Sequence, residues 1–525
     1  MARRIQQAIG ALVVVIGAVA WAVSVQGQVH VTDGALGEVT LTGFLRVQSD
    51  IHTGPRNPNT DANIDRFDLN QFRTWLLTDT DWKTPVHNLR FFLRTRVFFD
   101  HTPFIERHFK AFSTTGKNAK LTRVSTRDAA GELWEGWGDY TYGDWWLRVG
   151  RQNIVWGDVS PTRLLDDINP LDLSFHGLSE LSGREAFDNI RIPIWAARGA
   201  YTIPFLSDTQ IEGYVSPSDF GFIPTQLPAR NSPFDLLGLP PFITLRDDAR
   251  DGERGVSAGL RFVSAVGPVN YTINWITRRS NDGITQFESI QFDERRCISR
   301  IGTCIPLRSM VPFGGLSGDR LHLVAKHPRF NSVGASANYF EAWTKTVVRF
   351  EGVFDINRPF ELRTKGMPDF DGSPPAFQIN EADRFRRLQF GYAVAFDRPT
   401  FVFRRDRTAM LTLQFEQRVR GNPGSGKQLG MMGRKVDRHN EVITLLFSQP
   451  FAGFGGRYDE WFLDYTMLTD TDNAFFFQPA VRFEPGNHWR FAAWFNSFKG
   501  PENRAGTFGS LAFARGVNLS VSYQY

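Results

Sequence analysis

Residues 89–99 read LRFFLRTRVFF, and hydrophobicity in this stretch has a period of two. Successive side chains of a β-strand point to opposite faces. Apolar side chains therefore share one face of the predicted strand, while Arg90, Arg94 and Arg96 share the other. Such a strand combines a lipid-compatible face with a charged one.

The same alternation recurs along most of the chain. It appears in VVRFEGVFD at 347–355 and in AMLTLQFEQRVR at 409–420. A soluble sandwich also alternates, but its polar face meets solvent and rarely needs Arg and Glu repeated along one strand. Segments of about ten residues suit tilted strands that cross a bilayer. The pattern predicts an all-β fold, a transmembrane antiparallel β-barrel of roughly 16–18 strands.

Composition agrees with strands rather than membrane helices. The 525 residues are 42% hydrophobic and 14% aromatic, and the mean hydropathy is −0.28. These values exclude a bundle of transmembrane helices, whereas many aromatics without long apolar runs suit a membrane barrel. Sixty basic residues against 55 acidic ones leave a charge of +5, an excess too slight to indicate a nucleic-acid partner.

The first 27 residues have the pattern of a secretory signal peptide. A charged start precedes an apolar run at 9–25, and small or polar residues follow near Gly27. A membrane anchor is the alternative, but a polar, strand-like segment follows at once. We therefore expect residues 1–27 to be removed and residues 28–525 to form a barrel in the bacterial outer membrane. Its expected partners are membrane lipid and the barrel-assembly machinery.

Two long segments break the alternation. In 157–189, Ser160 and Pro161 have the residue types that cap and open a short helix, which Asn169 and the proline after it would end. Between these ends, Leu164, Leu165 and Ile168 recur at helical spacing. Residues 217–254 are too long for a turn and too apolar for a solvated tail. Long barrel loops cover the mouth or fold inward, so we expect both segments to plug or gate the lumen, with a plain surface loop as the alternative. The apolar side chains expected to line the passage are Leu164, Leu165, Phe175, Phe220, Phe222 and Phe234.

Charged side chains on the inferred luminal face allow two interpretations. Arginines alone would favour an anion channel, but Glu351 and other carboxylates fall on the same face. Ion pairs across neighbouring strands would stiffen the wall without selecting an ion, and we favour this structural role. The pore-lining or gating candidates are Arg90, Arg94, Arg96, Arg349, Glu351 and Arg418.

No motif predicts an enzyme, a cofactor or a metal site. The stretch GNPGSGK at 421–427 resembles a phosphate-binding loop, but Gln428 replaces the Ser or Thr that would hold magnesium. Ten scattered histidines show no metal-ligand spacing. A catalytic set assembled from distant strands stays open as an alternative.

The two cysteines, Cys297 and Cys304, are expected to form a small disulfide loop. An even count at short spacing favours a disulfide in an exported chain, and no histidine lies near to complete a zinc site. The haem-attachment pattern C-x-x-C-H does not occur, so the chain itself is not expected to carry electrons.

The most specific stretch, LRVGRQNIVWGDVSPTRLLDDINPLDL at 147–173, carries a family resemblance. It resembles proteobacterial outer-membrane proteins classed as a domain of unknown function, with a G-R-Q-x-x-x-W-G strand end and an N-P-L-D turn. The motif residues are Arg151, Gln152, Trp156, Asp167, Asn169, Pro170 and Asp172.

The resemblance implies neighbouring genes and a class of transported compound rather than a mechanism. Members of the family are often encoded beside a periplasmic partner and an inner-membrane transporter of the resistance-nodulation-division type, which implies transport of hydrophobic compounds. The family has no established functional residues. On physical grounds, Arg151 and Asp167 are expected to pair and the Asn169-Pro170 turn to dock the inward segment on the wall, with substrate contact as the alternative.

These observations predict a channel or transport protein that passes hydrophobic or amphiphilic compounds across the outer membrane. One alternative is a general porin for small hydrophilic solutes. Another is a scaffold barrel around a separate cytochrome.

The chain ends GVNLSVSYQY at 516–525, another alternating strand. In a closed barrel the last strand pairs with the first, which is expected near Glu38. Tyr525 resembles the terminal aromatic that the assembly machinery reads.

Overall fold

The computed structural model describes most of the chain. The described residues are 29–34, 37–57, 65–102, 123–125, 129–159, 162–173, 190–217, 222–227, 234, 243–248, 255–291, 297–300, 303–306, 319–364, 386–403, 406–431, 434–452, 460–471, 474–500 and 509–525. Within these ranges no helix has the length and apolar character needed to cross a membrane. Apart from one short 3₁₀ helix, every regular element described is a β-strand.

The main sheet has 20 strands. Two of them, β1 (Val29–Gly34) and β5 (Arg123–Ser125), pair only with β2 and β6, and the other 18 close into an antiparallel barrel, which confirms the predicted fold. Around the wall these are β2 (Gly37–His52), β3 (Leu69–Lys83), β4 (Leu89–Asp100), β6 (Ala129–Tyr142), β7 (Trp145–Gln152), β8 (Ile194–Thr202), β9 (Gln210–Pro217), β11 (Val256–Val266), β12 (Val269–Arg279), β17 (Arg329–Glu341), β18 (Thr346–Pro359), β20 (Arg386–Thr400), β21 (Ala409–Arg420), β24 (His439–Ala452), β25 (Glu460–Asp470), β26 (Phe475–Glu484), β27 (Trp489–Lys499) and β28 (Gly516–Gln524).

The last strand closes the barrel on the first. β28 pairs with β2 from Phe44 to His52, and Tyr525 exchanges two backbone hydrogen bonds with Gly43, of 2.9 and 3.0 Å. β1 then continues along the same edge of β2, over 37–41. The seam is thus covered along almost the whole length of β2.

The apolar face of the wall points outward and the polar face inward. In β4, Leu93 and Val97 are 42% and 48% exposed, whereas Arg96 is 1% exposed. In β18 the exposed Phe354 lies next to the buried Asp355. A protein surrounded by water would not present such a surface, but a barrel surrounded by lipid requires it.

Connections of unequal length give the barrel two different ends. One end, called here the short-turn end, carries the connections 84–88, 143–144, 203–209, 267–268, 342–345, 401–408, 453–459 and 485–488. The other, the long-loop end, carries 53–68, 101–128, 153–193, 218–255, 280–328, 360–385, 421–438, 471–474 and 500–515. Membrane barrels of bacteria have short periplasmic turns and longer extracellular loops.

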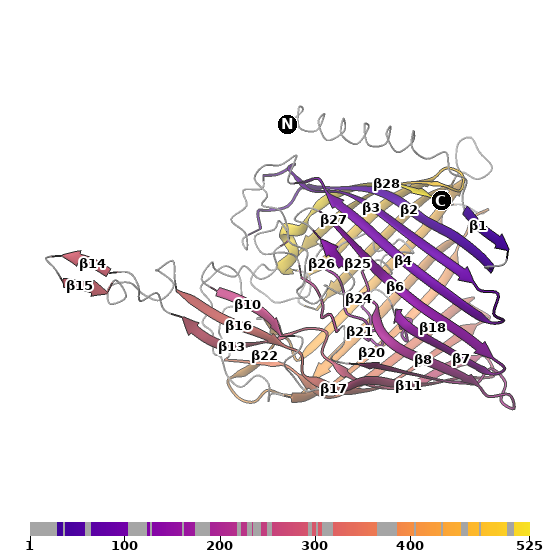
Figure 1. Cartoon of the computed structure of the whole chain (residues 1–525), viewed down its shortest axis with the longest axis horizontal. Helices are drawn as coiled ribbons and strands as arrows, with labels where there is room; N and C mark the ends of the chain where they lie inside the picture. Colours follow the sequence, from indigo (N-terminus) through magenta and orange to yellow (C-terminus); the bar gives the residue numbers. More distant parts are fainter. Residues whose placement is uncertain are drawn as a thin grey trace.

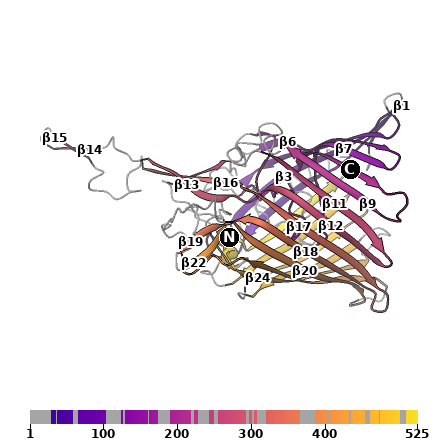
Figure 2. The same ribbon diagram turned by 90° about the horizontal axis from the view of Figure 1, so that it is seen from below.

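Small sheets extend the long-loop end. They project from the barrel there, whereas the C-terminus lies at the opposite end (Figures 1 and 2). The elements are the sheet of β10 (Ile243–Asp248), β16 (Arg320–Lys326) and β13 (Ile284–Gln291), the hairpin of β14 (Cys297–Arg300) and β15 (Thr303–Pro306), the sheet of β19 (Glu361–Thr364), β22 (Lys427–Met431) and β23 (Arg434–Val436), and the 3₁₀ helix η4 (Gly509–Ala514). The cysteine side chains lie outside the described part, so the disulfide stays a prediction.

The short helix expected within 157–189 is wrong for the residues described there. Arg163 has a φ of 54°, which an α-helix does not allow. The Leu165 N–H donates to the Glu351 side chain, in the barrel wall, instead of to a helical carbonyl. Contacts with the wall thus replace the helical ladder. Ser160 and Pro161 lie outside the described residues.

The segment 217–254 is divided between two places. β10 leaves the lumen and pairs in parallel with β16 in the projecting sheet. Residues 222–227 instead contact the β7–β8 connection, where Gln226 forms backbone hydrogen bonds with Leu171 and Leu173. Phe234 packs on inward-facing side chains of β24 to β27.

Candidate functional site: the plugged lumen

The connection between β7 and β8 enters the lumen below the rim of the barrel. β7 pairs with β6 only up to Gly136, although β6 continues to Ala129. The chain therefore leaves the wall partway up and returns at Ile194, the start of β8. The plug is defined here as the described residues of this connection, 153–159, 162–173 and 190–193.

The first anchor of the plug is Glu351, on the luminal face of β18. Its carboxylate accepts hydrogen bonds from three backbone N–H groups of the plug, those of Asp158, Val159 at 2.8 Å and Leu165 at 3.3 Å. Glu351 is buried. A buried carboxylate costs free energy unless it is hydrogen-bonded, so the wall and the plug depend on each other here.

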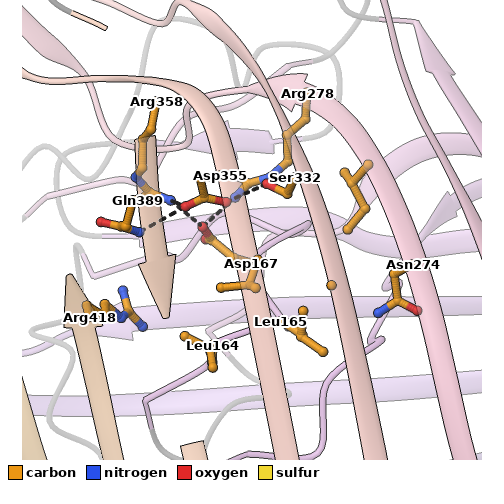
Figure 3. A pocket seen from close by; sticks show the side chains of 13 residues that line it. Leu164, Leu165, Asp167, Asn274, Arg278, Ser332, Asp355, Arg358, Gln389 and Arg418 are labelled. Carbon is orange, nitrogen blue, oxygen red and sulfur yellow. Dashed lines mark hydrogen bonds and ion pairs between the residues drawn. The ribbon is translucent and has the colours of Figure 1, made fainter. Parts of the chain in front are cut away.

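The second anchor is Asp167, which pairs with Arg278 of β12 (Figure 3). The Arg358 guanidinium lies 3.9 Å away, and Asn281 donates to the Asp167 carbonyl at 2.8 Å. Burial alone would raise the pKa of Asp167, but Arg278, Arg358 and Arg163 lower it to about 2. Asp167 is therefore charged at neutral pH. The predicted pair of Asp167 with Arg151 is wrong, because Asp167 pairs with Arg278 instead.

The third anchor joins Asp172 to the wall through Arg96. Arg96 donates to Asp172 at 2.7 Å and also pairs with Glu132, and its guanidinium lies 3.4 Å from the centre of the Trp134 ring. All four side chains are buried. Removing one member of such a network typically costs about 3–5 kcal/mol.

Asn169 and Pro170 form the turn that holds the two ends of the plug together. The Asn169 amide accepts from the Ile154 N–H and donates to the Ile192 carbonyl, both at 2.9 Å. The Pro170 carbonyl accepts from the Ile192 N–H at 2.8 Å. The motif turn is thus a structural clamp.

The G-R-Q-x-x-x-W-G residues attach the base of the plug to neighbouring strands. Arg151 donates to the carbonyls of Leu133 and, at 3.3 Å, Pro193. Gln152 donates to the Ala196 carbonyl at 2.9 Å. These bonds join β6, β7 and β8 where the β6–β7 ladder ends.

Trp156 provides a test of this attachment. Its indole N–H donates to the Glu212 carboxylate at 2.9 Å, and hydrogen bonds to charged groups contribute about 1.5–3 kcal/mol. We expect Trp156→Phe to lower the free energy of unfolding by about 2 kcal/mol, measured by urea titration in detergent. The control is Trp137→Phe, because the buried Trp137 indole N–H has no hydrogen-bond partner in the described part of the chain. Equal losses for the two variants would contradict the assigned bond.

Leu164 and Leu165, expected to line a passage, are packed against the wall. A Cβ at Gly391 would lie 2.7 Å from Leu164, and one at Gly334 would lie 2.3 Å from Leu165. Only glycine allows so close an approach. Both leucines cluster with Val353, and both line the pocket described next.

A pocket remains between the plug and the wall (Figure 3). It is small, and part of it is open to solvent. One side carries the Asp167 network, in which Asp355 accepts from Arg358 at 2.8 Å. Asn274 lines another side, where its buried amide has no hydrogen-bond partner among the described residues. The pocket therefore offers polar and apolar contacts to a solute.

The predicted luminal charges fall into two groups. Some pair across neighbouring wall strands, whereas Glu351, Arg96 and Arg418 contact the plug; Arg418 donates to the Thr162 carbonyl at 3.1 Å. Arg349 does both, since it also donates to the Asp158 carbonyl. The cross-strand pairs are Arg90 with Asp81, Arg94 with Asp79 and Arg349 with Asp397.

Phe222 lies beside His327, with ring centroids 5.5 Å apart, whereas Phe175 and Phe220 lie outside the described residues. The sequence pattern missed Arg278 and Arg358. Period-two alternation in β12 could have placed Arg278 in the lumen, but nothing local identifies its partner in the plug.

Groups of three or more His, Cys, Asp or Glu side chains that could hold a metal ion do not occur within the described ranges.

Three solved structures match this chain with low sequence identity and TM-scores below 0.5. OccAB1 of Acinetobacter baumannii matches with a TM-score of 0.46 and 9% identity, over 95% of this chain and 99% of that one. A BenF-like porin from Pseudomonas fluorescens matches with a TM-score of 0.45 and 7% identity, over 94% and 99% of the two chains. OpdK of Pseudomonas aeruginosa, solved with vanillate, matches with a TM-score of 0.44 and 8% identity, over 94% and 100%.

A search of curated proteins found no match. Residues 4–525 match the model of the family described as "Protein of unknown function (DUF1302)". Since this match spans almost the whole sequence, the chain belongs to the DUF1302 family.

Proposed function

We propose that this barrel is a bacterial outer-membrane channel that passes hydrophobic or amphiphilic compounds past a luminal plug. The closed wall and its exposed apolar outer face support a membrane location. A periplasmic partner and an inner-membrane transporter remain predictions from the family resemblance.

The observation that carries the proposal is an apolar patch on the inside of the long-loop end. Inward positions of β24 to β27 carry polar side chains, such as Thr466 and Gln478, mixed with apolar ones such as Trp494. Close to the mouth, each of these four strands carries an apolar side chain at an inward position. The luminal patch is defined as Val442, Leu468, Phe476 and Phe498.

A water-filled lumen does not require such a patch. Phe234 from the β9–β11 connection packs on it, together with Phe513 of η4. β9 lies across the barrel from these strands in the strand order, so the connection reaches over the mouth. When Phe234 leaves, an apolar entry surface is uncovered.

The proposal predicts opposite effects for two variants. Phe234→Ser uncovers the patch and is expected to speed uptake of a lipophilic fluorescent probe into proteoliposomes. Phe476→Gln makes the patch polar. Because the probe loses about 1.5 kcal/mol of apolar contact with the patch, uptake is expected to slow roughly tenfold. Phe475→Ala is the control, since Phe475 lies next to Phe476 on the outer face. Wild-type uptake no faster than that of empty liposomes would contradict the proposal.

A further inference from the structure

The barrel wall contains a slit between β8 and β9 towards the long-loop end. The two strands pair from Thr202↔Gln210 to Ala197↔Val215 and no further. Each nevertheless keeps pairing with its other neighbour, Trp195 with β7 and Pro217 with β11. The ladder between β8 and β9 thus ends three residues before the β7–β8 ladder on β8 and two residues before the β9–β11 ladder on β9.

Pro217 provides a physical reason for the slit. If the register continued, Pro217 would lie opposite Trp195, but proline has no N–H to donate to a ladder. The Ser216 hydroxyl donates to the Trp195 carbonyl at 2.6 Å and so spans the slit. A side-chain bond of this kind can break without unpairing the strands on either side.

A small pocket lies at the slit, part of it open to solvent. Alternation places Trp195 and Pro217 on the outer face of the wall and Tyr214 on the luminal face. Ile168 and Pro170 of the plug also line the pocket. The pocket is therefore bounded by residues of the lipid face, the lumen and the plug.

Tyr214 gives the pocket a specific polar group. Its side chain is 2% exposed, and its hydroxyl has no hydrogen-bond partner among the described residues. Buried polar groups normally have a partner. A hydroxyl or carbonyl oxygen on a bound solute would provide one.

We propose that this pocket is a lateral portal, which binds an apolar compound carrying a single hydroxyl or carbonyl group and passes it between the lumen and the membrane. The inference rests on the proposed function and adds the route and the class of compound. The plug blocks the axial path, and the slit opens sideways beside it.

The test locks the slit with the double variant Trp195→Cys, Pro217→Cys in proteoliposomes. Uptake of a fluorescent long-chain alcohol is compared between the oxidised and reduced forms of the same protein. We expect oxidation to lower uptake roughly tenfold, while ion conductance through the lumen stays the same. Equal uptake by the two forms would overturn the portal.

A second variant avoids the cross-link. Pro217→Val restores the missing N–H and is expected to slow uptake, whereas Pro399→Val, at the short-turn end of β20, leaves it unchanged. Tyr214→Phe is expected to weaken binding of the alcohol about fivefold but not binding of the matching alkane. If the wild-type protein speeds uptake of neither the alcohol nor the alkane, the proposed function fails. If it speeds uptake of both and no slit variant changes the rate, only the portal fails.

Discussion

Replacing Glu351 with alanine is expected to open the channel. The variant removes the acceptor for three backbone N–H groups of the plug. A loss of about 3 kcal/mol from these charge-assisted bonds would raise the ratio of open to closed channels roughly a hundredfold. Single-channel recording in planar bilayers should show frequent, large openings where the wild-type channel is mostly closed.

Two further variants make this result specific to the plug. Glu351→Gln keeps one acceptor oxygen and is expected to give an intermediate open probability. Glu484→Ala removes a luminal carboxylate that bonds to Arg482 of the wall, and it should leave gating unchanged. If the Glu351→Ala variant gates like the wild type, and circular dichroism shows that its barrel is folded, these bonds do not hold the plug.

Deleting Tyr525 is expected to reduce assembly strongly while leaving the pore properties of the inserted protein unchanged. The residue closes the seam through its two backbone bonds with Gly43. Its hydroxyl lies 2.7 Å from the Thr78 hydroxyl and donates to the Leu77 carbonyl at 3.2 Å. Each 1–2 kcal/mol lost at the seam lowers the folded-to-unfolded ratio about 5–30-fold. Quantitative immunoblotting of outer-membrane fractions measures the loss.

Tyr525→Phe distinguishes the contribution of the aromatic ring from that of the hydroxyl, since it keeps the ring and the backbone pairing. We expect this variant to assemble nearly as well as the wild type. Gly43→Ala should behave like the deletion, because its Cβ would lie 2.8 Å from the Tyr525 hydroxyl and 2.1 Å from the Leu77 carbonyl oxygen. Normal insertion of the deletion variant would refute the role of the seam.

The fold could be predicted from sequence because it depends on a local rule. Alternation in stretches such as 89–99 places Leu93 outward and Arg96 inward, and the same rule applied along the chain predicts the closed wall. Glu351 was correctly expected in the lumen for this reason. Its role was not predictable, because its partners lie about 190 positions earlier in an irregular segment.

The plug shows why the rest could not be predicted. Helical spacing of Leu164, Leu165 and Ile168 suggested a helix. That spacing instead reflects packing against wall glycines, and the left-handed Arg163 prevents a helix. Phe234 likewise follows no local pattern, since its packing surface is assembled from four strands that lie more than 200 residues later. Tertiary contacts decide both features.

The measurement that tests the central claim most directly compares two solutes in proteoliposomes containing the wild-type protein. One is a lipophilic fluorescent probe and the other a small hydrophilic sugar. The account predicts that the protein speeds uptake of the probe above that of empty liposomes and leaves the sugar nearly excluded, because the plug is anchored inside the lumen to β4, β12 and β18. Free passage of the sugar with a steady large conductance, and no gain for the probe, would contradict the account and indicate a general porin.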